Sequence, residues 1–362
     1  MPFDYERYTH EADRATLKAL KAIPGFSLLT KGFMNLWNEP QGRILNMSSR
    51  IRLGPDQMKK YYDMLPPICE KLGIGMPELY LEMNVTPNAY TYGDTAPFIV
   101  ITSGLLETIP EELVPTVLAH ECGHIACRHA LYITMGRMIL SGAAGVMSYF
   151  LKFGGLLSVP LQVAFYYWMR CSEFSADRAA VLCDGTPRKM QEVCMRLAGW
   201  DKNIDADANM DAFLRQAVDY RELINGSTWN KTLEFMVLSG ADHPLTAVRA
   251  TECGEWAKSE RFFRIMNGLP DPAEAPAGDA DSARADAQKK AGPFDLFGLL
   301  RPGKTDDLTG NAQDASPAAP DEGGDARAEA ACRELRWYKQ MADEGLISRE
   351  RYEQKKKELL GE

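Results

Sequence analysis

Residues 117–125 read VLAHECGHI, in which two histidines stand four positions apart and a glutamate follows the first. On a helix of about 3.6 residues per turn, His120 and His124 project from one face about one turn apart, so both imidazoles can hold one metal ion. Glu121 then lies close to the open position of a zinc ion and is the candidate general base toward a zinc-activated water. Because glycine costs about 1 kcal/mol in a helix relative to alanine, Gly123 predicts a close approach of backbone or substrate. The motif is short, so an ordinary helix that carries it by chance is the competing interpretation.

A second pair, Glu173 and Asp177, also stands four positions apart in a helix-like stretch. A catalytic zinc ion takes three protein ligands and keeps a fourth position open, and two histidines with one glutamate supply that set. Asp177 is then free to accept a hydrogen bond from the outer nitrogen of a ligand histidine. The competing interpretation, a solvated acidic helix face, is weakened by the apolar residues 165–169 just before it.

The motifs HExxH at 120–124 and ExxAD at 173–177, in this order, resemble those of the M48 family of zinc metalloendopeptidases, which includes HtpX-type and CAAX-processing proteases. The similarity covers about residues 55–262 and extends through 88–90, 99–106 and 243–249. Several motifs in the right order are far more specific than any one of them. The resemblance implies one zinc ion with Glu121 as general base, Asp177 behind the ligands, and the ligand set His120, His124 and Glu173.

Two further residues matter to this resemblance. His243 matches a family position near the metal, where it would help to hold the oxyanion of the tetrahedral intermediate. Cys122 departs from the family pattern, which usually has a larger apolar residue there. Since Cys122 lies two positions beyond His120, it should point away from the metal and fill the core.

The sequence predicts a mainly helical α+β fold, a zincin-like domain with a small sheet beside the zinc helix. Residues 79–82 and 98–102 have the composition of strands, and 88–92 are typical of a turn into another strand. The resemblance and this order of elements make 88–102 the candidate for an exposed strand edge that aligns a peptide by strand addition. Its substrate-binding residues would be Asn88, Ala89 and Tyr90. An ordinary internal hairpin is the alternative.

The remaining periodicity indicates further helices, within 8–30, over 56–72 as a single amphipathic helix, after Pro187, over 212–223 and over 233–238. Residues 33–53 show no strong period and are predicted to be loop or extended. His129 lies about 140° from His124 around the helix axis, so it is not expected to bind the same zinc ion. Arg249 is expected to form a structural ion pair with a carboxylate.

Residues 138–169 are the most hydrophobic part of the chain, divided by KFGG at 152–155 into two halves. Each half is shorter than the roughly 20 residues that a straight helix needs to cross a bilayer. Two interpretations compete, a hairpin that makes peripheral contact with a membrane and a buried pair of core helices.

The C-terminal part differs in composition from the rest. Residues 1–265 are predicted to form the protease domain, including the N-terminal helix and the apolar hairpin, and 266–330 a disordered acidic linker rich in Ala, Pro and Gly. Residues 331–362 are similar to the short SHOCT domain, a helical hairpin too small to be stable alone, which implies self-association or a partner. The FDLFGLL segment at 294–300 is either a docking element or a solvated apolar patch.

Composition limits the compartment and the partners. The net charge of −9 and the absence of a basic patch give no indication of nucleic-acid binding. Eight cysteines without a C-x-x-C pair suit a reducing compartment, and no signal peptide is visible. The expected location is the cytoplasm, with or without association with the cytoplasmic face of a membrane.

These features favour a zinc-dependent endopeptidase that hydrolyses peptide bonds of protein substrates. A scaffold or chaperone-like binding protein with a structural zinc is the alternative, but a structural site has no use for a base such as Glu121. An intramembrane CAAX-type protease would need more and longer apolar spans than this chain has.

Overall fold

The computed structural model describes residues 2–23, 39–140, 159–201, 208–227 and 245–271, with a few single residues and pairs between them and at 353, 356 and 357. The chain divides into two units, Met1–Arg301 and Pro302–Glu362. The elements below belong to the first unit. The predicted linker, the FDLFGLL segment, the SHOCT-like hairpin and residues 233–238 lie almost wholly outside the described residues, so these predictions and the domain boundaries stay predictions.

A four-stranded mixed sheet stands beside a helical body. Its strands are β1 Ile51–Leu53, β2 Glu78–Glu82, β3 Ala89–Tyr92 and β4 Phe98–Thr102, in the order β1-β2-β4-β3. β2 and β4 are parallel, whereas β1 and β3 pair antiparallel with their neighbours. β4 is apolar and fully buried, as a central strand must be, and β3 lies at the edge. The predicted fold class, mainly helical with a small sheet, is confirmed.

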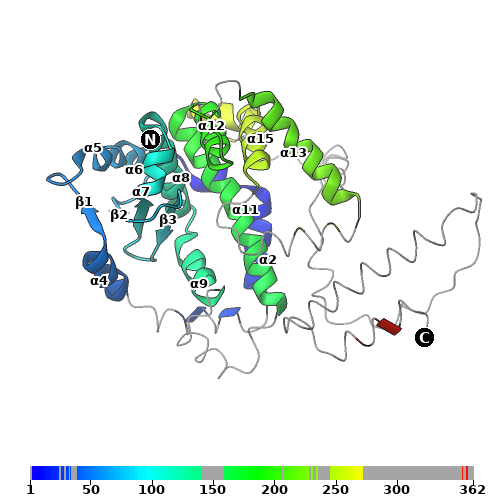
Figure 1. The fold of residues 1–362 in the computed structure, drawn as a ribbon, viewed down its shortest axis with the longest axis horizontal. Helices are drawn as coiled ribbons and strands as arrows, with labels where there is room; N and C mark the ends of the chain where they lie inside the picture. The colour runs from blue at the N-terminus through cyan, green and yellow to red at the C-terminus, as the bar shows by residue number, and fades with distance from the viewer. Residues whose placement is uncertain are drawn as a thin grey trace, which may run out of the picture. The chain divides into compact units, whose positions relative to one another are not determined.

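Helix α8 (Val114–Ala126) carries the HExxH motif through the centre of the first unit. It follows a short 3-10 turn, η1 (Glu111–Leu113), and all its side chains except those of Pro115 and Ile125 are buried. A helix that is apolar around most of its circumference can only be stable with neighbours on all sides. The sheet lies on one side of α8 and the long α11 (Val159–Asp184) on the other (Figure 1).

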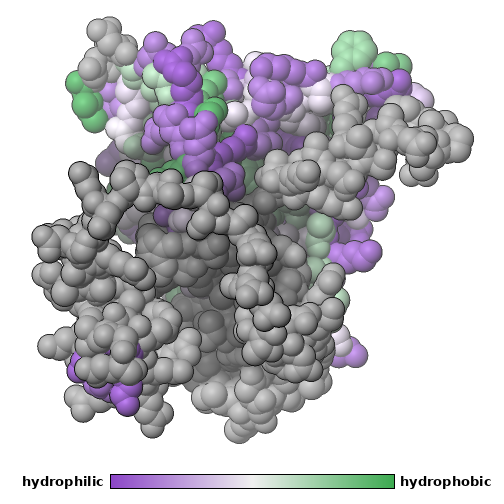
Figure 2. Space-filling model, turned by 90° about the vertical axis from the view of Figure 1, so that its right-hand side faces the viewer, coloured by the Kyte–Doolittle hydropathy of each residue, from purple (hydrophilic) through white to green (hydrophobic). Residues whose placement is uncertain are grey.

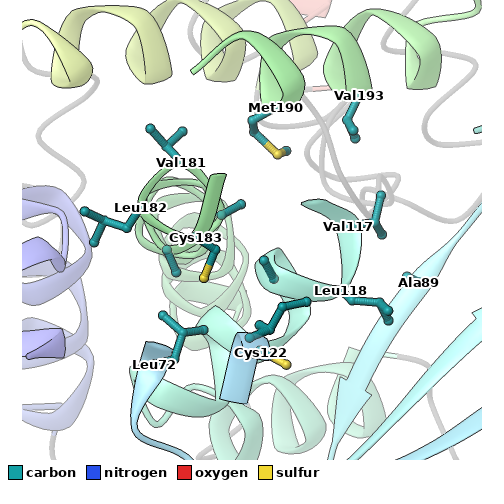
Figure 3. Close-up of a cluster of buried hydrophobic side chains, with 14 of the residues drawn as sticks. Leu72, Ala89, Val117, Leu118, Cys122, Val181, Leu182, Cys183, Met190 and Val193 are labelled. Carbon is teal, nitrogen blue, oxygen red and sulfur yellow. The ribbon is translucent and has the colours of Figure 1, made fainter. Parts of the chain in front are cut away.

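Small residues let α8 and α11 approach closely. A Cβ atom on Gly123 would lie 2.7 Å from the Cβ of Ala179 and 3.0 Å from the Cα of Ala176. Gly123 therefore marks a close backbone approach, as its position in a helix predicted. Cys122 is fully buried in the main hydrophobic core with Leu118 and Cys183, so the prediction that it fills the core is confirmed (Figure 3).

Further helices surround this centre. α2 packs on α11 from one side, while α12 and α15 pack together above α8 and α11 (Figure 1). The face shown in Figure 2, on the side of α13, is mainly hydrophilic in its upper part with scattered hydrophobic side chains, which is typical of a surface helix. The bounds are α1 Tyr5–Tyr8, α2 Glu11–Lys21, α4 Glu39–Ser49, α5 Lys59–Tyr62, α6 Leu65–Leu72, α7 Ser103–Thr108, α9 Ala130–Leu140, α12 Arg188–Leu197, α13 Met210–Asn225, α15 Thr246–Ala257 and α16 Glu260–Met266.

Two predictions about the N-terminal third were wrong. Residues 56–72 form two helices, because Pro66 and Pro67 lack a backbone N–H and start a new helix more readily than they continue one. Residues 33–53 contain α4 and β1. The exposed side chains of Ile44, Leu45 and Met47 hide the usual separation of polar and apolar faces on α4, so its period was not visible.

The apolar stretch 138–169 is only partly described. Its first residues end α9 and its last residues begin α11, whereas 141–158 lie outside the described part. Among the described helices, none combines the length and apolar character needed to cross a membrane. Both interpretations of this stretch, a hairpin in contact with a membrane and a buried pair of core helices, therefore stay predictions.

Candidate metal centre

Three side chains from two helices converge in the core. The candidate ligand atoms of His120, His124 and Glu173 all lie within 4.8 Å of one another, and the three side chains are buried. The two Nε2 atoms are 3.2 Å apart, and the carboxylate oxygens of Glu173 lie 3.5 Å from Nε2 of His120 and 3.4 Å from Nε2 of His124. In the described part of the chain this is the one group of three such side chains.

The spacing of these atoms fits a zinc ion. Bonds of about 2.1 Å at tetrahedral angles place ligand atoms about 3.4 Å apart, close to the separations found here. Two imidazoles and one carboxylate are also a donor set of catalytic zinc sites that leaves a fourth position open. The three residues therefore fit zinc in both geometry and chemistry.

The electrostatics of the cluster favour a positive charge. Burial lowers the pKa of His120, but hydrogen bonds to and charges on Asp177 and Glu173 outweigh it and raise that pKa to about 9. At His124 burial dominates, and the pKa falls to about 4. The pocket thus attracts one cation, a proton on His120 or a metal ion between the three side chains.

Asp177 and Arg249 lie directly behind the three side chains. Asp177 Oδ1 is 2.8 Å from Nδ1 of His120, which leaves Nε2 of that ring to face the cluster. Arg249, on α15, donates to both carboxylate oxygens of Asp177 at 2.6 and 2.8 Å, and its Nη1 lies 3.0 Å from Glu173. Burial would raise the pKa of Asp177, but Arg249 outweighs it and keeps the carboxyl ionised. The ion pair predicted for Arg249 is confirmed.

Glu121 lies beside the cluster and is held by the sheet. Its side chain is buried, and Oε2 accepts a hydrogen bond of 2.7 Å from the hydroxyl of Thr91 on β3. Alternation along β3 turns Ala89 and Thr91 inward and Tyr90 and Tyr92 toward the other face. The edge strand thereby contacts the carboxylate that the sequence marks as the candidate base.

A cavity of about 290 Å³ opens at this point. His120, Glu121 and Arg249 form its polar wall. Val117 of α8 and Met190 and Val193 of α12 lie around it (Figure 3), and the rest of the lining is Thr86, Pro87, Asn88, Ala89, Leu105 and Leu197. A mostly apolar pocket with a few convergent polar groups is typical of a site for a substrate side chain.

Comparison with known proteins gives a family that suits this geometry. Residues 64–257, more than half of the chain, match peptidase family M48. The chain belongs to peptidase family M48. It is therefore a metallopeptidase, and a metal-dependent protease.

Relatives of this M48 chain carry names of the same kind. It is 31% identical to the plastoglobule-localized metallopeptidase 48, chloroplastic, of Arabidopsis thaliana over 265 residues, which are 73% of this chain and 76% of the relative. It is 29% identical to the protease HtpX homolog of Trichormus variabilis over 215 residues, 52% of this chain and 73% of the relative. It is 24% identical to the protease HtpX homolog 2 of Methanosarcina acetivorans over 160 residues, 38% of this chain and 54% of the relative. No solved structure matches.

The predicted strand residues of this M48 chain separate into two groups. Asn88 and Ala89 line the cavity. Tyr90 lies on the opposite face of β3, where its hydroxyl donates to Glu82 and accepts from Arg50. The side chain of Tyr90 thus does not line the cavity. His243 lies outside the described residues.

Sequence reasoning missed three features of the M48 site. Thr91 was not singled out, although inward alternation from Ala89 would have placed it toward the zinc helix. The pocket residues of α12 have no signal beyond apolar spacing. Helical spacing directs His129 away from the metal, and it does not belong to the group of three, but its Nδ1 lies 3.1 Å from Nδ1 of His124.

Proposed function

We propose that this M48 metallopeptidase is a zinc-dependent endopeptidase that cleaves peptide bonds of protein substrates, with Glu121 as general base and three zinc ligands, His120, His124 and Glu173. The observation that carries this proposal is a buried N,N,O donor set with tetrahedral spacing whose neighbour, Glu121, lines a cavity. A scaffold with a structural zinc would have no need of a buried carboxylate or a cavity there.

Zinc at this site would supply Lewis-acid chemistry, which polarises a peptide carbonyl and makes water acidic enough to attack at neutral pH. Glu121 would take the proton of the attacking water and deliver it to the leaving amine. Thr91 would hold the Glu121 carboxylate in place through its hydroxyl. We assign to His243 the role that the family pattern implies, which is to hold the oxyanion of the tetrahedral intermediate.

Substrate binding would use the edge strand and the apolar pocket together. β3 ends the sheet, and Asn88 and Ala89 line the cavity where a peptide must pass to reach Glu121. The side chains of Val117, Met190 and Val193 make the pocket suitable for an apolar side chain next to the cleaved bond. The proposal places this activity in the cytoplasm or at the cytoplasmic face of a membrane, and it assigns residues 331–362 to self-association or to binding of a partner.

The decisive variant is Glu121→Gln, which keeps size and polarity but removes the base. Cleavage of an unfolded protein such as casein should fall by about 10²–10⁴-fold or more, because proton transfer by a positioned group contributes that much. Zinc content by elemental analysis and the melting temperature should stay those of the wild type. Glu112→Gln, an exposed change at the start of the same helix region, is the control and should leave turnover unchanged.

Two results would contradict the proposal. Wild-type turnover in the Glu121→Gln protein would remove the general base. Purified wild-type protein with no stoichiometric zinc, and no gain of activity on adding zinc to chelator-treated protein, would remove the metal site.

A further inference from the structure

A chain of hydrogen bonds runs from His124 to the N-terminal helix. Nδ1 of His124 lies 3.1 Å from Nδ1 of His129, and Nε2 of His129 lies 2.9 Å from Oδ2 of Asp13 on α2. The exposed fractions of His124, His129 and Asp13 are 2%, 1% and 1%, so water does not compete for these contacts. The donors and acceptors of these three side chains therefore have to be satisfied by one another and by their buried neighbours.

Local geometry at the end of α8 brings His129 back to the site. Arg128 has a left-handed backbone with φ of 59°, which turns the chain sharply after Cys127. The backbone N–H of His129 donates to the carbonyl of His124 at 2.8 Å, so the turn is closed on that residue. The side chain of His129 consequently faces the ring of His124, although the helical spacing alone would direct it elsewhere.

Only one arrangement of protons satisfies the chain when Nε2 of His124 binds a metal. That nitrogen needs its lone pair, so the proton of His124 sits on Nδ1 and is donated to His129. Nδ1 of His129 must then accept, which puts the proton of His129 on Nε2. This proton is donated to Oδ2 of Asp13, which must accept.

Asp13 is built to be such an acceptor. The indole N–H of Trp168 donates to Oδ1 at 2.9 Å, and the hydroxyl of Ser175 donates to Oδ2 at 2.6 Å. Burial would raise the pKa of Asp13, but His129, Ser175 and Trp168 outweigh it and hold the pKa at about 2. The side chain is thus a carboxylate with donors on both oxygens and is fixed in place by α11.

We propose that Asp13 is a positioning residue of the metal centre, which acts through His129 to fix the tautomer and the ring orientation of His124. The N-terminal segment 2–23, which lies outside the M48 match at 64–257, is then a working part of the site. This inference rests on the proposed role of His124 as a zinc ligand. Partners that orient a ligand histidine typically contribute 10- to 100-fold to metal affinity.

Asp13→Asn tests the inference with almost no change of shape. An amide has one acceptor and one donor end, whereas Trp168, Ser175 and His129 all donate to residue 13. If the amide turns its NH₂ to His129, it forces the wrong tautomer on that ring. If it turns its NH₂ to Trp168, two N–H donors meet head on at a buried contact, and the amide has to leave its place beside His129. In both orientations His129 loses its fixed acceptor. Zinc affinity of the full chain, measured by competition with a chromogenic chelator, should fall about 10- to 100-fold.

Thr16→Val is the matched control. Thr16 is buried on the same helix, and its hydroxyl donates to the carbonyl of Ala12 at 2.7 Å, but it takes no part in the chain to His124. If Asp13 only held α2 onto the body, both variants would lower the melting temperature of the zinc-free protein, and both would bind zinc as tightly as the wild type. The inference requires a loss of zinc affinity in Asp13→Asn and none in Thr16→Val.

His129 supplies the coupling test. In His129→Asn, the amide oxygen can still accept from Nδ1 of His124, so zinc affinity should fall less than in His129→Leu. Because Asp13 acts through His129, adding Asp13→Asn to His129→Leu should cost no further zinc affinity. If His129→Leu does not fold, the same cycle is run with His129→Asn, where the added loss should be well below that in the wild-type background.

The outcomes separate this inference from the proposed function. Wild-type zinc affinity in folded Asp13→Asn, or an equal loss in Thr16→Val, would overturn the role of Asp13 while leaving the zinc site intact. The same conclusion would follow if Asp13→Asn lowered zinc affinity as much in the His129→Leu background as in the wild-type background. If His124→Ala bound zinc as tightly as the wild type, the proposed ligand set itself would be wrong.

Discussion

Thr91 is the side chain through which the sheet reaches the proposed base. Its hydroxyl donates to Oε2 of Glu121 at 2.7 Å, and the pair is buried. Thr91→Val keeps the shape of the side chain but removes this donor, so Glu121 loses a fixed direction. A buried hydrogen bond to a charged group contributes about 1.5–3 kcal/mol, which predicts a fall in kcat of about 10- to 100-fold with little change in KM.

Steady-state kinetics on a peptide substrate would measure this effect. Thr91→Ser retains the hydroxyl and should stay within a few-fold of the wild type. If Thr91→Val had wild-type kcat, Thr91 would have no part in holding the base.

Arg249 shows how single residues balance the charge behind the site. Two buried carboxylates, Asp177 and Glu173, contact it at 2.6 and 3.0 Å. Breaking such a pair by removing one partner is costly because a charge is left buried without compensation. The guanidinium of Arg249 compensates the charge of the second carboxylate. The pocket can therefore hold Asp177 and Glu173 together with one further cation.

At the scale of elements, the contact between α8 and α11 sets the distance between the imidazoles and Glu173. Gly123→Ala would place a Cβ 3.0 Å from the Cα of Ala176 and 3.1 Å from its carbonyl oxygen, and backbone cannot move aside cheaply. Overpacking costs about 1–3 kcal/mol or more, against about 1 kcal/mol gained in helix propensity. We expect a net destabilisation of about 1–2 kcal/mol, toward the upper end because backbone atoms are met, and reduced zinc content.

Gly254→Ala on α15 is the comparison. Its new Cβ would meet only the terminal amide of Gln191, the flexible end of a side chain, which can move aside but loosens its hydrogen bond to the carbonyl of Ala250. This loss offsets the gain of about 1 kcal/mol in helix propensity, so the net change in stability should be well under 1 kcal/mol. Urea unfolding of both variants provides the measurement. Equal stability of the two variants would mean that the helices can separate without cost.

The elements show what local sequence can and cannot predict. HExxH and ExxAD predict which residues meet, because four-residue spacing fixes a helix face and the chemistry of zinc selects the donor types. The division of 56–72 into α5 and α6 was visible only in Pro66-Pro67, and α4 had no regular apolar face. Contacts such as Asp13 to His129 join residues far apart in the chain, and no local pattern encodes them.

For the whole molecule, the centre depends on segments from four parts of the chain. α8 and α11 supply the candidate ligands, α15 supplies Arg249, and the N-terminal segment supplies Asp13. The docking of that segment is thus coupled to the site, and conditions that weaken it should weaken the fold. His10, at the start of α2, makes this docking sensitive to pH.

His10 caps α2 and is neutral in the folded protein. Its Nδ1 accepts from the N–H of Ala12 at 3.0 Å, and its Nε2 lies 4.0 Å from Glu252. Burial and then the charge of Arg178 lower its pKa to about 4, although Glu11 and Asp13 act in the opposite direction. Protonation of Nδ1 would remove the cap.

The sign of the pH effect follows from these values. The pKa of His10 is about 6.5 in the unfolded chain and about 4 in the folded protein. Between these two pH values the unfolded chain binds a proton on His10 and the folded protein does not. Stability from this residue is therefore full above pH 6.5 and is lost as the pH falls through this window, by about 2 kcal/mol at pH 4.5.

His10→Asn keeps a cap that does not titrate, so its free energy of unfolding should fall about 2 kcal/mol less than that of the wild type between pH 7 and 4.5. Urea unfolding of both proteins across this range measures the difference, in which acid effects on the metal ligands cancel because both proteins share them. Parallel pH profiles for the two proteins would show that His10 already binds its proton in the folded state.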